Sequence, residues 1–136
     1  MRARRAAALL VPALAVTVLA GCSVPQDRAD TVAATAERFS ARAAARDMSA
    51  ACALLAPTVR DELAGTPGPT CAAGLTEAGL PFAGSVRSTA VYGRHAQVTL
   101  DGDTYFLALS TEGWRVVAAG CTPRTDRPYD CEVKGD

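Results

Sequence analysis

The sequence predicts a single α+β domain over residues 30–136, in which N-terminal helices pack on an antiparallel sheet of four to five strands. Before about residue 80, apolar residues recur at helical spacing. From Val86 onward, apolar and polar residues alternate between tight turns, as in consecutive strands. Four cysteines of this region add two expected disulfides. A chain of 136 residues is long enough for one such core and too short for two domains.

Residues 1–21 have the organisation of an export signal. A basic stretch precedes an apolar run over residues 6–20, which Pro12 interrupts. The run is shorter than the roughly 18 to 20 residues needed to cross the hydrocarbon core, so a cleaved signal is favoured over a permanent span. An ordinary secretory signal is the simplest interpretation of this segment, but the residues that follow it indicate a more specific one.

Leu19-Ala20-Gly21-Cys22 resembles the bacterial lipobox, in which the cysteine accepts a diacylglyceryl group and becomes the first residue after cleavage. We therefore expect Cys22 to be lipidated, with residues 22–29 forming the lipidated N-terminus and a polar tether. At about 0.8 kcal/mol per buried methylene, two or three acyl chains hold a protein on a membrane. The expected location is extracytoplasmic, anchored to the bacterial cell membrane. The alternative is a secretory signal followed by an incidental cysteine.

The charge balance argues against a nucleic-acid partner. The whole chain has no formal net charge, but three of its 14 basic residues and none of its 14 acidic residues lie in residues 1–21. The mature domain is therefore mildly acidic and has no cluster of lysine or arginine. Such a domain lacks the counter-charge that supplies most of the affinity for phosphate backbones.

The five cysteines make sense in an oxidising compartment if Cys22 carries lipid, since an even set of four remains. Four cysteines permit three pairings. Pairing Cys52 with Cys71 and Cys121 with Cys131 closes the smallest loops, and each bridge is expected to contribute about 3 kcal/mol. No two of these thiols have the short spacing of structural zinc sites, so we expect disulfides and no metal.

The first helix is predicted over residues 30–46. Its apolar residues fall on one face, whereas charged residues occupy the others. A second helix is predicted over residues 48–55, and Pro57 starts a further turn because proline suits the first turn of a helix. Residues 65–69 contain glycine and proline and are expected to form a loop. Thr70 is expected to cap one more short helical turn. The apolar face of the first helix is made by Val32, Ala36, Phe39 and Ala43.

Asp101-Gly102 is the clearest turn signal of the predicted sheet. As a two-residue hairpin loop it places Val98 opposite Tyr105 and Ala96 opposite Leu107, which gathers apolar residues on one face. Leu100 then opposes Asp103.

Glu112-Gly113 is interpreted as the next loop, with Leu109 opposite Val116 and Leu107 opposite Ala118. Both registers place their apolar residues on the same face of the sheet. A first strand is expected over residues 86–92. The tail beyond Cys121 is expected to be a disulfide-closed loop, with a return as a fifth edge strand as the alternative.

Helices followed by a curved antiparallel sheet, with Gly113-Trp114-Arg115-Val116 opening the last main strand, resemble the nuclear transport factor two-like (cystatin-like α+β) superfamily in its small actinobacterial lipoprotein form. The resemblance covers about residues 30–119. It also rests on an alanine-rich first helix and on a cysteine followed by paired leucines. It implies a cone-like fold with a pocket between helices and sheet. Ketosteroid isomerase-like and dehydratase-like members use that pocket for catalysis, with a carboxylate or a His-Asp pair inside.

We expect a non-enzymatic module that binds an envelope protein or another envelope component. Asp101 and Asp103 are expected in a solvent-facing turn, and His95 on the polar face, so no acid or base is expected inside the cone. The first alternative is a carrier of a small apolar ligand, and the second is an isomerase-like or dehydratase-like enzyme. No cofactor and no metal are expected. The pocket walls of the carrier are expected from Val98, Tyr105, Leu107 and Trp114.

Overall fold

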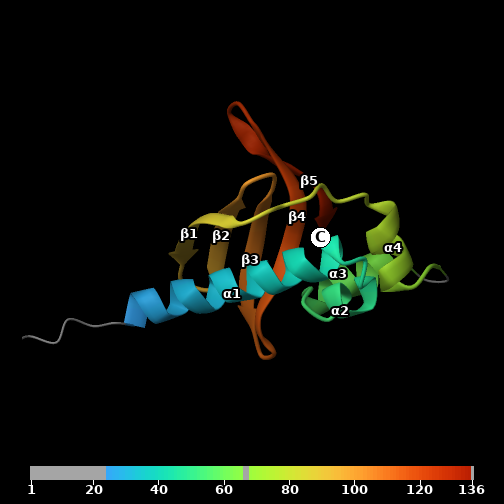
Figure 1. Cartoon of the computed structure of the whole chain (residues 1–136), viewed down its shortest axis with the longest axis horizontal. Coiled ribbons are helices and arrows are strands. Elements are labelled where there is room, and N and C mark those ends of the chain that lie inside the picture. Colours follow the sequence, from blue (N-terminus) through green and yellow to red (C-terminus); the bar gives the residue numbers. More distant parts are fainter. Residues whose placement is uncertain (1–23, 66–67, 136) are drawn as a thin grey trace, which may run out of the picture.

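Figure 1 shows the computed structural model of the chain, which describes residues 24–65 and 68–135. Helices pack against a five-stranded antiparallel sheet of order β1-β2-β3-β4-β5, as expected for an α+β fold. The expected export signal and Cys22 lie outside the described residues. The elements are α1 (Val24–Ala44), α2 (Met48–Cys52), α3 (Pro57–Ala64), α4 (Cys71–Glu77), β1 (Val86–Tyr92), β2 (His95–Leu100), β3 (Thr104–Ser110), β4 (Gly113–Arg124) and β5 (Arg127–Lys134).

Helix α1 lies across one face of the sheet, and the three short helices gather near its C-terminal end (Figure 1). It begins at Val24, so residues 24–29, which we expected to form a tether, are its first turns. Pro25 is tolerated in the first turn of α1 because the first amide groups of a helix need no intrahelical partner. Asp27 in the same turn meets the positive end of the helix dipole.

The short helices are positioned by side-chain caps and by one disulfide. Asp47 accepts a hydrogen bond from the Ala50 amide and starts α2, and Thr70 caps α4 as expected. Both disulfides have the expected pairing. Cys52 in α2 bonds to Cys71 in α4 across the glycine- and proline-containing loop, and Cys121 bonds to Cys131 across the pair β4 and β5.

The β2–β3 hairpin has the predicted register. Val98 pairs with Tyr105 and Ala96 with Leu107, around the turn at Asp101-Gly102. The tail after Cys121 continues β4 and returns as β5, which confirms the alternative of a fifth edge strand.

The predicted register of β3 and β4 is wrong by two residues, because the turn residues are Thr111 and Glu112. Gly113 pairs with Ser110 and has a φ of 92°, a conformation that suits glycine directly after a tight turn. Leu107 therefore pairs with Val116. A shift of two residues preserves the side-chain faces, so the apolar residues still share one side.

The outer edge of β4 is covered by two different segments. Strand β5 pairs with its C-terminal part. Farther toward the start of β4, the α2–α3 connection forms a parallel bridge, in which the Ala56 amide donates to the Val116 carbonyl and the Val116 amide donates to the Leu54 carbonyl, both at 2.9 Å. The connection thus satisfies backbone groups that an open edge leaves unpaired.

Candidate ligand-binding cavity

The four expected pocket residues lie in the hydrophobic core. Val98 and Leu107 are fully buried, Tyr105 is 1% exposed and Trp114 is 5% exposed. They belong to one cluster with Val32, Ala36 and Phe39 from α1, so side chains fill the space between this part of α1 and the sheet. The ring of Phe39 meets that of Tyr105 edge to face, with centroids 5.2 Å apart.

A cavity of about 320 Å³ lies next to this core, at the C-terminal end of α1. Its other walls come from α2, α4, β3 and the connection between α4 and β1. Of the four expected pocket residues, Tyr105 lines this cavity, whereas the other three do not. The space remains open because α1 presents Ala43 and Ala44 here and the connection presents Gly79, none of which reaches across. Its volume is at the lower end of the range for small-molecule sites.

The inner part of the cavity carries two buried hydroxyl groups, those of Ser40 and Tyr105. Burial raises the pKa of the Tyr105 hydroxyl, and the nearby charge of Asp103 raises it further, whereas its hydrogen bond with Ser40 acts in the opposite direction. The phenol therefore stays protonated at neutral pH and behaves as a neutral hydrogen-bonding group.

Asp103 is buried, contrary to the prediction of a solvent-facing turn. It is 8% exposed, and its carboxylate accepts hydrogen bonds from the amides of Gly120 and Cys121, both at 2.9 Å, and from that of Thr104. Loss of water raises the pKa of this carboxyl, while the three amide hydrogen bonds work to lower it. The predicted pairing with Leu100 was the signal that could have located it, since that register places Asp103 on the apolar face.

Asp101 and His95 lie at the surface, as expected. The Asp101 carboxylate accepts hydrogen bonds from the Ser85 amide and the Arg87 side chain, and these two contacts lower its pKa. Asp101 therefore belongs to the exposed hairpin turn, two residues from the buried carboxylate of Asp103.

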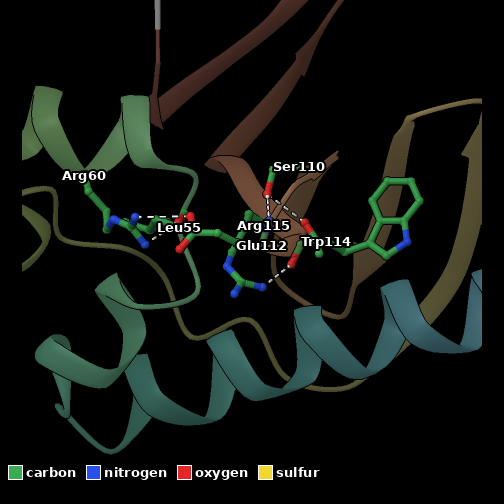
Figure 2. Close-up of polar contacts among 7 residues, drawn as sticks. Leu55, Arg60, Ser110, Glu112, Trp114 and Arg115 are labelled. Atoms are coloured by element: carbon green, nitrogen blue, oxygen red, sulfur yellow. Dashed lines mark hydrogen bonds and ion pairs between the residues drawn. The ribbon is translucent and has the colours of Figure 1, made fainter.

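A cluster of polar contacts ties α3 to the β3–β4 turn (Figure 2). Arg60 donates to the Leu55 carbonyl and to the Glu112 carboxylate, each at 3.3 Å. Next to it, Arg115 donates to the Trp114 carbonyl at 2.9 Å, while its buried Nε has no partner among the described residues. The contact between Arg60 and Glu112 joins α3 to the turn, whereas the other contacts are local in sequence, so the role of this cluster is structural.

The N-terminal part of α1 contacts the β1–β2 turn and the start of β4. The Arg28 guanidinium lies 5.7 Å from the centre of the Trp114 ring and donates to the Gly93 carbonyl in the β1–β2 turn. A cation over an indole face is attracted to it. Trp114 thus packs against α1 as part of the hydrophobic core.

Three further results bear on function. Within residues 24–65 and 68–135, no three His, Cys, Asp or Glu side chains gather closely enough to hold a metal ion. Among the helices of this part of the chain, none combines the length and apolar character needed to cross a membrane. The chain matches no protein-family model, no curated protein and no solved structure. The resemblance to the nuclear transport factor two-like superfamily therefore stays a prediction.

Proposed function

We propose that this chain is an extracytoplasmic lipoprotein, anchored to the bacterial cell membrane through Cys22, whose domain is a non-enzymatic binding module. The observation that carries the anchor is the disulfide pairing. The four cysteines of the described residues form two disulfides with one another, and Cys22 is the remaining cysteine of the sequence. Cys22 is also the residue that follows Leu19-Ala20-Gly21 at the end of the apolar run.

The two disulfides support an oxidising compartment. Disulfides persist in secreted and envelope proteins, whereas the bacterial cytosol keeps most thiols reduced. The proposal therefore assigns one thiol to lipid and four to the covalent framework of the folded domain.

Metabolic labelling in the native host tests the anchor. The full-length protein is expected to incorporate a fatty-acid analogue and to sediment with membranes, whereas Cys22→Ser is expected to lose the label. Cys121→Ala combined with Cys131→Ala is the matched control, because it removes cysteines without touching the anchor and should keep the label. An unlabelled wild-type protein in the soluble fraction would contradict the proposal.

The cavity supports a more specific binding function, that of a carrier for a small ligand with an apolar body. Its walls include Met48, Leu75 and Leu80, and its volume is in the range of small-molecule sites. We propose that the sheet curves as in the cone-like nuclear transport factor two-like fold. Register shifts in three of the four strand pairs support curvature, since bulges bend strands.

The non-enzymatic part of the proposal rests on the residues that line this cavity. Neither a histidine nor an acidic residue is among them. Asp103, the nearby buried carboxylate, has three amide groups as hydrogen-bond donors and is used in joining β3 to β4. General acid-base catalysis requires a suitable titratable group within reach of the substrate, and the ionisable side chains of the lining are Tyr105, whose phenol is protonated, and Arg46.

A further inference from the structure

We propose that the cavity at the C-terminal end of α1 binds a small carboxylic acid with an apolar body, whose carboxylate contacts Arg46. This inference rests on the carrier function proposed above and adds the chemical class of the ligand. The exposed side chain of Arg46 lines the cavity beside apolar side chains.

Arg46 is the only charged residue among those that line the cavity. Within the described residues it takes part in no ion pair. The carboxylate next to it in sequence is already used, because Asp47 pairs with Arg42 at 3.4 Å and caps the Ala50 amide. A single cation without an acidic partner at a cavity favours an anionic ligand, and a planar guanidinium binds a carboxylate through two parallel hydrogen bonds.

The interior of the cavity presents apolar side chains next to hydroxyl groups, which suits an uncharged and largely apolar body. Leu75, Leu80 and Met48 line the walls. The Ser40 hydroxyl lies close enough to that of Tyr105 to lower its pKa, so each of these buried hydroxyls has a polar neighbour without a polar group from the ligand. At about 30 Å³ for each water-sized group, the volume of about 320 Å³ holds roughly ten non-hydrogen atoms. An eight-carbon acid has this size.

The backbone of Arg46 has a conformation that is unusual for an arginine. Its φ is 58°, in the left-handed region that side chains other than glycine rarely adopt. Its amide bonds to the Ala43 carbonyl and the Asp47 amide to the Arg42 carbonyl, which is the Schellman arrangement that commonly places glycine here. An arginine in a position that favours glycine indicates that its side chain has a use. The competing explanation is a favourable contact of the cation with the negative end of the helix dipole.

Ligand titration separates these explanations. Octanoate, octanol and octylammonium share one apolar chain and differ in charge, so their affinities report the preference of the site. The full-length protein is placed in phospholipid nanodiscs, with empty nanodiscs as the reference for partitioning, and binding is measured by calorimetry. The wild type is expected to bind octanoate at least about tenfold more tightly than octanol, and octylammonium most weakly.

Arg46→Gly is the decisive variant because it removes the charge and also relieves the backbone. It is expected to raise the unfolding temperature by about 4 °C and to bind octanoate no better than octanol. Arg46→Lys should retain part of the preference for octanoate. Arg38→Gln is the matched control: it removes a cation from the same helix outside the cavity lining, leaves the Arg42–Asp47 pair intact and should bind like the wild type.

The outcomes distinguish the ligand class from the carrier function. Equal affinity for all three probes, or a preference for octanoate that survives Arg46→Gly, overturns the assignment of an acid while the carrier function stands. Binding of none of the three probes overturns both. Loss of the preference in Arg46→Gly together with a higher unfolding temperature supports the proposal, since a purely structural role for the side chain predicts no loss of ligand discrimination.

Discussion

The two parts of α1 meet the rest of the domain in different ways. Its middle carries Val32, Ala36 and Phe39, which are fully buried against the large side chains of the sheet. Its C-terminal end carries Ala43 and Ala44 and faces α4 and a glycine-containing connection, where a cavity remains. Apolar burial stabilises both parts, since Leu75 and Ala83 at the cavity are also buried, but the open part is additionally held by a disulfide and helix caps. One amphipathic helix thus supplies both part of a packed core and the wall of a cavity.

Leu→Ala substitutions in the two parts give the largest expected contrast. Leu107 is fully buried in the packed part, so Leu107→Ala should lower the free energy of unfolding by about 2–5 kcal/mol. Leu80 is half-buried at the cavity, and Leu80→Ala should cost only about 1 kcal/mol. Urea denaturation measures both values. Equal losses would show that the two parts are packed alike.

Removal of the Cys52–Cys71 disulfide should weaken the open part. Its cysteines are 19 residues apart, so replacing both by alanine should lower the free energy of unfolding by about 3 kcal/mol. Hydrogen exchange should accelerate in α4 more than in β3. Replacement of Cys121 and Cys131 is the control and should leave exchange in α4 unchanged; faster exchange there would mean that the two parts are not independent.

Asp103→Asn tests the buried carboxylate at the border of the two parts. The amides of Thr104 and Cys121 donate to one carboxylate oxygen and that of Gly120 to the other, so an asparagine has one oxygen to accept and its amide nitrogen leaves at least one of the three donors unsatisfied. The free energy of unfolding should fall by about 1–3 kcal/mol in urea denaturation at pH 7. A fully stable variant would show that these hydrogen bonds contribute little.

The pH dependence of stability should have opposite signs for the two neighbouring aspartates. The pKa of Asp103 is raised above 3.8 in the folded protein, so its contribution is largest below that pH and declines as the pH rises through the folded pKa. The pKa of Asp101 is lowered, so its contribution is present above pH 3.8 and declines as the pH falls. Urea denaturation of Asp103→Asn and Asp101→Asn from pH 2 to 7, each against the wild type, measures the two slopes, and slopes of the same sign would contradict the assignment.

Local patterns were sufficient to predict most of the fold. Apolar periodicity located α1, the Asp101-Gly102 turn set the β2–β3 register, and cysteine spacing predicted both disulfides. The β3–β4 turn was misplaced because Gly113 was assigned to the loop, whereas its positive φ places it at the first pair after the turn. A dipeptide ending in glycine does not by itself distinguish these two positions.

The cavity was harder to predict than the fold, because its position depends on where side chains leave space between packed elements. The apolar face of the sheet correctly identified Val98, Leu107 and Trp114 as inward-facing, but their neighbours on α1 fill the space around them. The cavity depends instead on small residues at the end of α1 and on the course of the α4–β1 connection, which no local pattern specifies. Nothing in the sequence around Arg46 indicated that this residue lines a cavity.

The most direct test of the account is a nuclear magnetic resonance titration of the ¹⁵N-labelled full-length protein in nanodiscs with octanoate. We expect the amide resonances of Ser40, Arg46 and Leu75 around the cavity to shift. The amide resonances of Val98 and Val116 in the packed part should remain unchanged. Unshifted amides throughout, or shifts centred on Val98 and Val116, would contradict the assignment of the open end of α1 as the binding site.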